Sequence, residues 1–403
     1  MTVSIRRETP QRASIAAVLE HAWDAGTFRA DDIMDRTGLT RSTTISGIDS
    51  LIELGLVREL ANARTEHGYR TGRPARRFEL CADAGMVVGM DAGRAHVTTI
   101  LADLRGHRLA TTSFETDLDA DADQRRRDLT ESLDATLRAV DAPRSELLSV
   151  CVGVPAPVDA DGRSPSHRDG FWPKSNPELL THITPWAPIV QLSNDASLAA
   201  LAEGTEGAAQ DSDNYVALLS GARFGMGVVI DGHLLHGRHG GVGETVVFGR
   251  IEGVDDPDGL GQTIARWARQ ELAAGRIGPE HPLAQLPPAL VTAQHVLQLA
   301  HEGDSASREL TARAAAMLSR ITGMIGSFYD PEIVVVSGAV SAGIHDVVAA
   351  ARSTLAEELD LPAPRLIAST LGAEVVAIGA VAAAVAAARD GVLALTPERT
   401  FAR

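Results

Sequence analysis

Apolar segments of strand length occur along the chain in the same order twice, and this repeat limits the possible folds more than any other feature. In the first set, MVVGMDAG, HVTTILADL and HRLATTSFE predict a three-strand meander, which is followed by a polar helix to about Val140 and the strand LLSVCVGVPAP. The second set begins at NYVALLSG and GMGVVIDG and runs through long helices to the buried strand EIVVVSGAV. Two β-β-β-α-β-α halves that face a cleft predict an α/β body of the actin-like, ribonuclease-H-like kind.

The residues before this repeat have a helical pattern of their own. SIAAVLEHAWDAG places its apolar residues at helical spacing and ends at a glycine. A short helix from about Ala30, a turn at residues 37–39 and a second helix opening at Thr40 give the outline of a helix-turn-helix. VREL and RRFEL then predict two short strands around an arginine-rich loop, so residues 1–82 are expected to form a winged helix-turn-helix.

The second helix of this motif is expected to read DNA. Its inward stripe is Ile45, Ile48, Leu51 and Ile52, which leaves small polar side chains and Gly47 toward solvent near its N-terminal half. Hydroxyl and guanidinium groups donate to base edges and phosphates, and an extended arginine-rich loop suits a minor groove. A helical hairpin that only packs is the alternative. The predicted DNA contacts are Thr40, Arg41, Ser42, Thr43, Ser46, Arg70, Arg73 and Arg76.

The charge distribution supports a DNA-binding front segment on an acidic body. The chain carries a net charge of −16, but residues 1–80 hold 12 arginines against 11 acidic residues, a net of +1, so the remainder carries −17. Residues 58–77 hold six arginines against two glutamates, a local excess that favours a phosphate backbone, although a solvated turn has the same composition. No run of about 18 apolar residues and no apolar leader is apparent, so we expect a cytoplasmic protein without a membrane partner.

Several motifs in this order resemble one family. The segments GLTRSTTISGIDSLIELGLVREL and TGRPARRFEL, followed by GMVVGMDAG, are similar to the winged helix, linker and first body strand of the ROK family, which contains sugar kinases and sugar-responsive repressors. The resemblance extends over nearly the whole chain. It implies a first lobe over residues 83–197, a second lobe over residues 198–373, and a C-terminal helix at about residues 374–390 that packs back on the first lobe.

The resemblance also implies two phosphate-binding loops, and both are altered. The family's Asp-x-Gly-Gly-Thr is Asp91-Ala92-Gly93-Arg94-Ala95, and its Gly-Thr-Gly-x-Gly-x-Gly is Gly221-Ala222-Arg223-Phe224-Gly225-Met226-Gly227. A phosphate needs close backbone approach and a hydroxyl donor, and arginine in place of glycine adopts a positive φ only at a cost. Asp91, Arg94, Gly221, Arg223 and Gly225 are therefore interpreted as degenerate phosphate loops in a protein without kinase activity.

Part of the family's sugar site is retained. By this resemblance Asp195, in SNDASLAALAEG, is the relic of the general base, although an Asn-Asp pair that only caps a helix is the alternative. The residues expected to face a sugar are Gly153, His167, Asn194, Asp195 and Glu244. The family's zinc-module histidine is replaced, with Val246 and Val247 after Gly243-Glu244, and no cysteine follows, so neither a metal nor another cofactor is expected.

These features favour a repressor of carbohydrate-metabolism genes that binds a double-stranded DNA operator as a homodimer or higher homo-oligomer and responds to a sugar or sugar phosphate. The alternatives are an ATP-dependent sugar kinase with a fused DNA-binding domain, and an effector-independent dimeric regulator. The helices expected at residues 289–301 and 305–329 are candidates for dimer or relay elements. Arg94 and Arg223 enter loops that face the same phosphates in a kinase, so they are expected either to pair with Asp91 and close the nucleotide site, or to bind an anionic effector.

Overall fold

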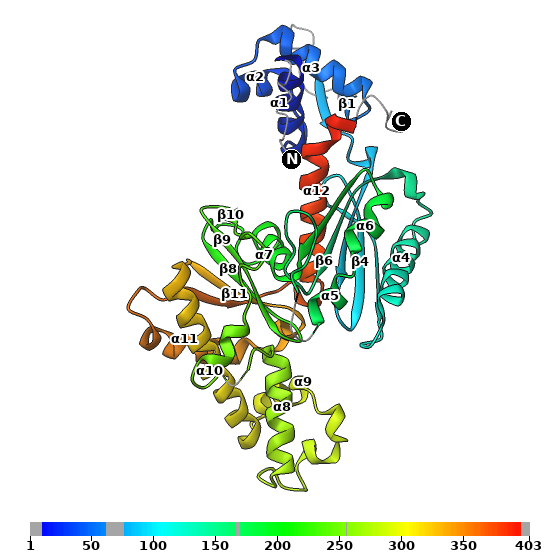
Figure 1. Cartoon of the computed structure of the whole chain (residues 1–403). Helices are drawn as coiled ribbons and strands as arrows, with labels where there is room; N and C mark the ends of the chain where they lie inside the picture. The colour runs from blue at the N-terminus through cyan, green and yellow to red at the C-terminus, as the bar shows by residue number, and fades with distance from the viewer. Residues whose placement is uncertain (1–9, 62–75, 167–169, 255, 396–403) are drawn as a thin grey trace.

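A winged helix stands at one end of the computed structural model, above a two-lobed body (Figure 1). The structure describes residues 10–61, 76–166, 170–254 and 256–395. The winged helix consists of α1 (Pro10–Asp24), α2 (Ala30–Thr37), α3 (Arg41–Glu53), β1 (Val57–Leu60) and β2 (Arg77–Leu80). β1 and β2 pair antiparallel, and Phe28 adds an isolated bridge to Phe78.

Local sequence signals set the helix boundaries here. Gly38 ends α2 in the left-handed conformation, with φ of 70°. Thr40 caps α3, where its hydroxyl accepts from the Thr43 amide at 3.3 Å. The expected orientation of α3 is wrong at Gly47, which is buried against α1: a Cβ there would lie 2.9 Å from Val18. Ile48 and Leu51 are buried as expected, whereas Ile45 is only half-buried.

The first lobe is built on a five-stranded sheet in the order β5-β4-β3-β6-β7. The antiparallel meander β3-β4-β5 continues through parallel pairing of β6 to β3 and of β7 to β6. The strands are β3 (Met86–Ala92), β4 (His96–Asp103), β5 (Arg108–Glu115), β6 (Leu147–Val154) and β7 (Ile189–Asn194), and the helices are α4 (Ala122–Arg138), α5 (Phe171–Ser175) and α6 (Leu179–Ile183). β3 and β6 are buried along their whole length, as expected for central strands covered on both faces.

The second lobe repeats this topology, in the order β10-β9-β8-β11-β12. Its strands are β8 (Tyr215–Ser220), β9 (Phe224–Ile230), β10 (His233–Leu234), β11 (Ile333–Ser337) and β12 (Arg365–Ala368), and its helices are α8 (Leu260–Ala273), α9 (Ala293–Glu302), α10 (Ser305–Tyr329) and α11 (His345–Leu355). β11 lies parallel to both β8 and β12, while β9 is antiparallel to β8 and β10. The duplicated order confirms the actin-like architecture expected from the strand repeat.

Two helices, α7 (Asp195–Thr205) and α12 (Val375–Leu395), connect the parts of the molecule. α12 packs on β3, β6 and α7, and its far end reaches α1 of the winged helix (Figure 1). Gly379 allows the close approach of the two helices, because a Cβ at this position would lie 1.8 Å from the Leu198 carbonyl oxygen. α9 and α10 lie in the second lobe, away from the winged helix (Figure 1). Their expected role as dimer or relay elements stays a prediction.

The C-terminal helix is strongly apolar, although Arg389 and Asp390 interrupt it and no run of about 18 apolar residues results. An 18-residue stretch within residues 372–395 has a mean hydropathy of 1.7, and the helix is long and apolar enough to cross a membrane by length and composition alone. More than half of the most apolar stretch is buried inside the protein. A buried core helix can have the same length and apolar composition as a membrane-spanning helix. The alanine, valine and glycine residues of α12 allow it to pack tightly between the first sheet and α7.

Candidate functional site: a cleft between the lobes

A cleft of about 1680 Å³ separates the two lobes. Eight of the residues expected from the sequence line it: Asp91, Arg94, Asn194, Asp195, Gly221, Arg223, Gly225 and Glu244. Gly153 is instead buried within β6, where a Cβ would lie 2.7 Å from Leu198 and 2.9 Å from Val376. Gly153 therefore allows α7 and α12 to pack, while Pro155 of the same segment lines the cleft. His167 lies outside the described residues.

The first altered loop is held by a histidine that the sequence did not indicate. His96 Nε2 lies 2.9 Å from Asp91 Oδ2, and this contact raises the pKa of the His96 imidazole above its ordinary value. The imidazole ring covers Gly93, where a Cβ would lie 2.8 Å from the ring. Asp91 thus pairs with His96 and not with Arg94 or Arg223, contrary to the expected closure of the nucleotide site through Asp91.

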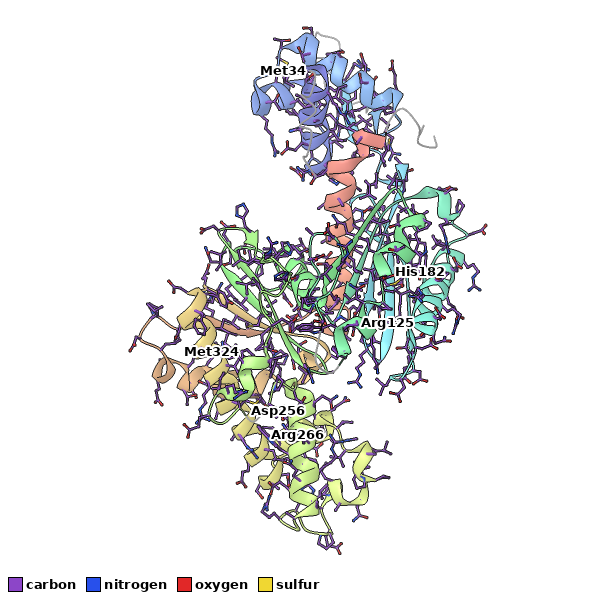
Figure 2. All side chains as sticks on the ribbon, in the orientation of Figure 1. Met34, Arg125, His182, Asp256, Arg266 and Met324 are labelled. Carbon is purple, nitrogen blue, oxygen red and sulfur yellow. The ribbon has the colours of Figure 1, made fainter. Side chains whose placement is uncertain are left out.

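A buried arginine positions both this loop and the adjacent helix α5. Arg125, on α4 in the first lobe (Figure 2), donates to the carbonyl oxygens of Ala92 at 2.6 Å, Gly93 at 3.1 Å and Ser175 at 2.9 Å. Ala92 is the last residue of β3, Gly93 follows it, and Ser175 is the last residue of α5. One guanidinium group therefore joins the end of β3 to the end of α5. Trp172, on α5, lines the cleft and also packs on the core of the first lobe.

The Asn194-Asp195 pair combines helix capping with a position on the cleft. Asn194 Oδ1 accepts from the Ser197 amide at 3.1 Å, and its Nδ2 donates to the Ala156 carbonyl at 3.2 Å. Asn194 therefore caps α7 and holds the segment after β6. Asp195 Oδ1 accepts from the Ala196 amide at 2.8 Å. Burial, aided by the nearby Asp91, raises the pKa of Asp195 to about 8, so this carboxyl group is largely protonated at neutral pH.

Glu244 faces the same cleft from the second lobe. Burial raises the pKa of its carboxyl group, while the charge of Arg223 opposes the shift. Glu244 forms an isolated bridge with Gly225, and the Met226 amide donates to the Gly243 carbonyl at 3.0 Å. The segment that carries Glu244 is thus fixed to the start of β9.

Helix packing explains the glycines at residues 225 and 227 of the second altered loop. Gly221, Arg223, Gly225 and Gly227 all have ordinary backbone conformations, so the expected strain at Arg223 is absent. Gly227 lies directly under α7: a Cβ there would be 2.2 Å from the Ala196 carbonyl oxygen and 2.5 Å from the Ala200 Cβ. The glycines at residues 225 and 227 therefore allow α7 to lie on the β9 backbone.

A neighbouring loop supports Arg223. Arg223 forms an isolated bridge with Asp258, and the Phe224 amide donates to the Pro257 carbonyl at 2.9 Å. Arg266, labelled with Asp256 in Figure 2, contacts the Asp256 carboxylate at 2.5 Å and the Asp258 carboxylate at 3.7 Å. This ion pair anchors the loop against which Arg223 is held.

The residues at the family's zinc position do not fit a metal. Val246 and Val247 stand there, exposed, in the 3-10 helix η4 (Val246–Arg250). Valine offers no ligand atom, and within the described residues no group of three or more His, Cys, Asp or Glu is arranged to hold a metal.

A second candidate surface lies on α3 of the winged helix. A shallow groove there is lined by Arg41, Ser42, Ile45, Ser46, Asp49, Ser50 and Glu53. Two of the predicted DNA-contacting arginines are engaged within the domain: Arg41 with Asp31 at 3.2 Å, and Arg76 with Glu59 at 2.8 Å. Thr40 is occupied as the helix cap, and Arg70 and Arg73 lie outside the described residues.

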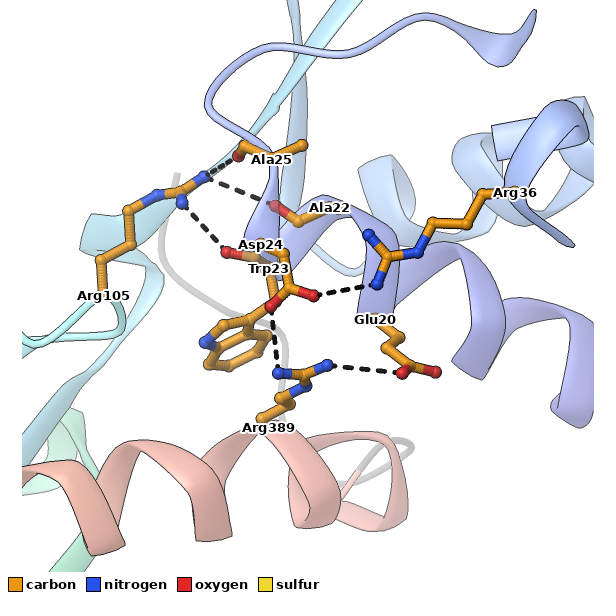
Figure 3. Close-up of polar contacts among 8 residues, drawn as sticks. All are labelled: Glu20, Ala22, Trp23, Asp24, Ala25, Arg36, Arg105 and Arg389. Carbon is orange, nitrogen blue, oxygen red and sulfur yellow. Dashed lines mark hydrogen bonds and ion pairs between the residues drawn. The ribbon is translucent and has the colours of Figure 1, made fainter. Parts of the chain in front are cut away.

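Two arginines of the body contact α1 of the winged helix (Figure 3). Arg105, which follows β4, donates to the carbonyls of Trp23 at 3.0 Å and Ala25 at 2.6 Å, so it satisfies free carbonyls at the C-terminal end of α1. Arg389, on α12, contacts the carboxylates of Asp24 at 3.1 Å and Glu20 at 3.5 Å. The sequence carried no signal for these contacts.

One continuous hydrophobic core runs behind this junction. It includes Val18 of α1, Ile378 and Val392 of α12, and Leu198 of α7. The first residues of α12, Val375 and Val376, line the cleft. A single continuous helix thus extends from the cleft to the winged helix.

The fold and the cleft define a two-lobed actin-like body of the sugar-kinase kind with a winged helix attached. The chain belongs to the ROK family, whose model matches residues 87–250 and 260–387. The xylose repressor of Bacillus subtilis (strain 168) is 27% identical over 225 residues, which cover 53% of this chain and 54% of that protein. A glucokinase of Halalkalibacterium halodurans is 26% identical over 231 residues, or 53% of this chain and 68% of that protein.

Among solved structures, a ROK family transcriptional regulator described as a homologue of the E. coli MLC protein superposes with a TM-score of 0.72 at 19% identity. The match covers 96% of this chain and 98% of the other, so the winged helix and the body both have counterparts there. The chain spans about half the length of the curated B. subtilis relative that it matches.

Proposed function

We propose that this protein is a transcriptional repressor of carbohydrate-metabolism genes that binds double-stranded DNA through its winged helix and responds to a ligand in the interlobe cleft. The observation that carries this proposal is the path of α12, which begins beside the cleft and ends in ion pairs with α1. A ligand that prefers one arrangement of the lobes shifts the position of α12, and by linkage it then changes the affinity for DNA.

The exposed face of α3 is the part of the winged helix that would enter the major groove. Its serines can hydrogen-bond to base edges, and Asp49 can accept from a cytosine amino group. Arg41 and Arg76 would exchange their present carboxylate partners for phosphates, which makes DNA binding salt-dependent. A two-fold symmetric operator and a homodimeric, cytoplasmic repressor are part of this proposal.

We further propose that the body has no kinase activity. Arg94 and Ala95 replace the second glycine and the hydroxyl residue of the first phosphate loop, and Arg223 replaces a glycine of the second. Phosphoryl transfer depends on positioning and charge stabilisation, and long side chains in both loops remove the close backbone approach that positions a triphosphate.

The proposal is tested by electrophoretic mobility shift on the DNA upstream of the protein's own gene, with and without sugars that include xylose and glucose. We expect binding without sugar and release by at least one of them. In Arg389→Ala, which removes both ion pairs between α12 and α1, sugar-induced release should fall roughly fivefold or more. Arg365→Ala removes a comparable exposed ion pair, with Glu332, and should behave as the wild type.

Other outcomes discriminate between the alternatives. DNA binding that ignores every sugar favours an effector-independent regulator. Sugar-dependent formation of ADP from ATP by the wild-type protein contradicts the absence of kinase activity. Unaltered release in Arg389→Ala contradicts the role of α12.

A further inference from the structure

Two arginines from opposite lobes approach the same aromatic ring in the cleft. Arg94 follows β3 in the first lobe, and Arg223 precedes β9 in the second lobe. The guanidinium carbon of each lies 5.9 Å from the centroid of the Phe171 ring. The two cations are therefore separated by no more than twice that distance, although their loops belong to different sheets.

The arrangement around the two arginines is held in place by the body. Phe171 begins α5, whose end is fixed by the hydrogen bond from Arg125 to the Ser175 carbonyl. Arg125 also donates to the carbonyls of Ala92 and Gly93, the two residues that precede Arg94. Both Arg94 and Arg223 remain exposed to the cleft. A guanidinium that stacks on a ring keeps its edge N–H groups free to donate.

The polar end of the cleft lies beside these cations. Asp195 and Glu244 line the same cavity. The positive charge of Arg223 acts on the Glu244 carboxyl group, where it opposes the rise in pKa that burial causes. Carboxyl groups of this kind fix the orientation of sugar hydroxyls. The neutral form of Asp195 at pH 7 donates a hydrogen bond and does not repel an anion.

We propose that the effector of this protein is a phosphorylated sugar, with its hydroxyls on Asp195 and Glu244 and its phosphate bridging Arg94 and Arg223. A phosphate monoester carries close to two negative charges at neutral pH and accepts paired hydrogen bonds from guanidinium groups. Because one arginine comes from each lobe, the bound phosphate draws the lobes together, and a neutral sugar lacks this contact. The inference rests on the proposed function, since it names the ligand class of the same cleft.

The test is isothermal titration of the full-length protein, without DNA, with matched pairs of ligands. The pairs are glucose, mannose, N-acetylglucosamine and fructose, each with its 6-phosphate, and inorganic phosphate and ATP are added as separate probes. We expect one 6-phosphate to bind roughly tenfold or more tightly than its neutral sugar and than inorganic phosphate. Arg94→Ala and Arg223→Ala should each remove most of that preference, whereas Arg238→Ala, which removes an exposed arginine of the second lobe outside the cleft, should retain it.

Three results overturn the inference. In the first, no 6-phosphate is preferred over its neutral sugar. In the second, the preference survives in the Arg94→Ala, Arg223→Ala double variant. In the third, ATP or inorganic phosphate binds as tightly as any sugar phosphate. A parallel mobility shift without ligand keeps the two proposals apart, because loss of operator binding contradicts the repressor and not the ligand class.

Discussion

The glycines of the second altered loop give the sharpest test of the packing argument. If Gly227 is needed because α7 lies on β9, then Gly227→Ala destabilises the protein, and Gly221→Ala in the same loop does not. The two positions differ in their surroundings: a Cβ at Gly227 meets the Ala196 carbonyl oxygen at 2.2 Å, whereas the nearest atom to a Cβ at Gly221 is 3.7 Å away. Neither glycine has a positive φ, so backbone strain is absent at both positions.

The expected magnitude follows from these distances. Ordinary contact begins at about 3.4 Å, so α7 or β9 must shift by roughly 1 Å, and overpacking of this kind costs about 1–3 kcal/mol. The more restricted unfolded chain offsets part of this, since replacing glycine by alanine stabilises by about 0.4–1 kcal/mol where the conformation is allowed. We therefore expect Gly227→Ala to lose about 1–2 kcal/mol, and Gly221→Ala to be neutral or slightly more stable.

The assay is urea unfolding of both variants, followed by far-ultraviolet circular dichroism. The midpoint should fall for Gly227→Ala without a change in slope, and it should be unchanged or higher for Gly221→Ala. Because α7 also packs on α12, Gly227→Ala should in addition weaken the sugar response of DNA binding. Equal stability of the two variants would refute the packing explanation, and a nucleotide-binding role for the loop would then be open again.

Three further predictions concern the cleft and the winged helix. Asp195 has a pKa near 8, above its unfolded value, so the folded protein holds an extra proton and stability falls as pH rises between about 4 and 8. Asp195→Asn should flatten that slope, by at most about 1.4 kcal/mol per pH unit in urea titrations; an unchanged slope contradicts the assignment. Thr40→Ala removes the α3 cap and should cost about 1 kcal/mol in thermal unfolding and weaken DNA binding, whereas Thr40→Ser should not. Arg125→Ala should cost about 2–4 kcal/mol, because it leaves three carbonyls without their donor, while Arg127→Ala on the same helix should cost under about 0.5 kcal/mol; similar losses in both would contradict the anchoring role.

The sequence alone determined the architecture. The repeated order of strand-length segments predicted two sheets of the same topology, because alternation of apolar runs with turns is a local property that neighbouring residues encode. The helix caps at Gly38 and Thr40 were also local signals. The replaced residues of the two phosphate loops were visible in the sequence, since they follow from residue identity alone. The boundary between the lobes at residue 197 remains a prediction, because α7 packs on β9 of the second lobe and on α12 and β7 of the first.

The packing roles of the two loops and of the C-terminal helix became visible only in the folded chain. Asp91 contacts His96, and Arg125 donates hydrogen bonds to the ends of both β3 and α5. These contacts depend on side-chain directions that residue spacing does not reveal. Gly225 and Gly227 looked like a phosphate cradle, but the helix lying on them is folded from a different part of the chain. Asp24 and Arg389 are 365 positions apart, and no local pattern pairs them. Such contacts arise only when whole faces of helices and sheets pack together, and this packing connects the cleft to the winged helix.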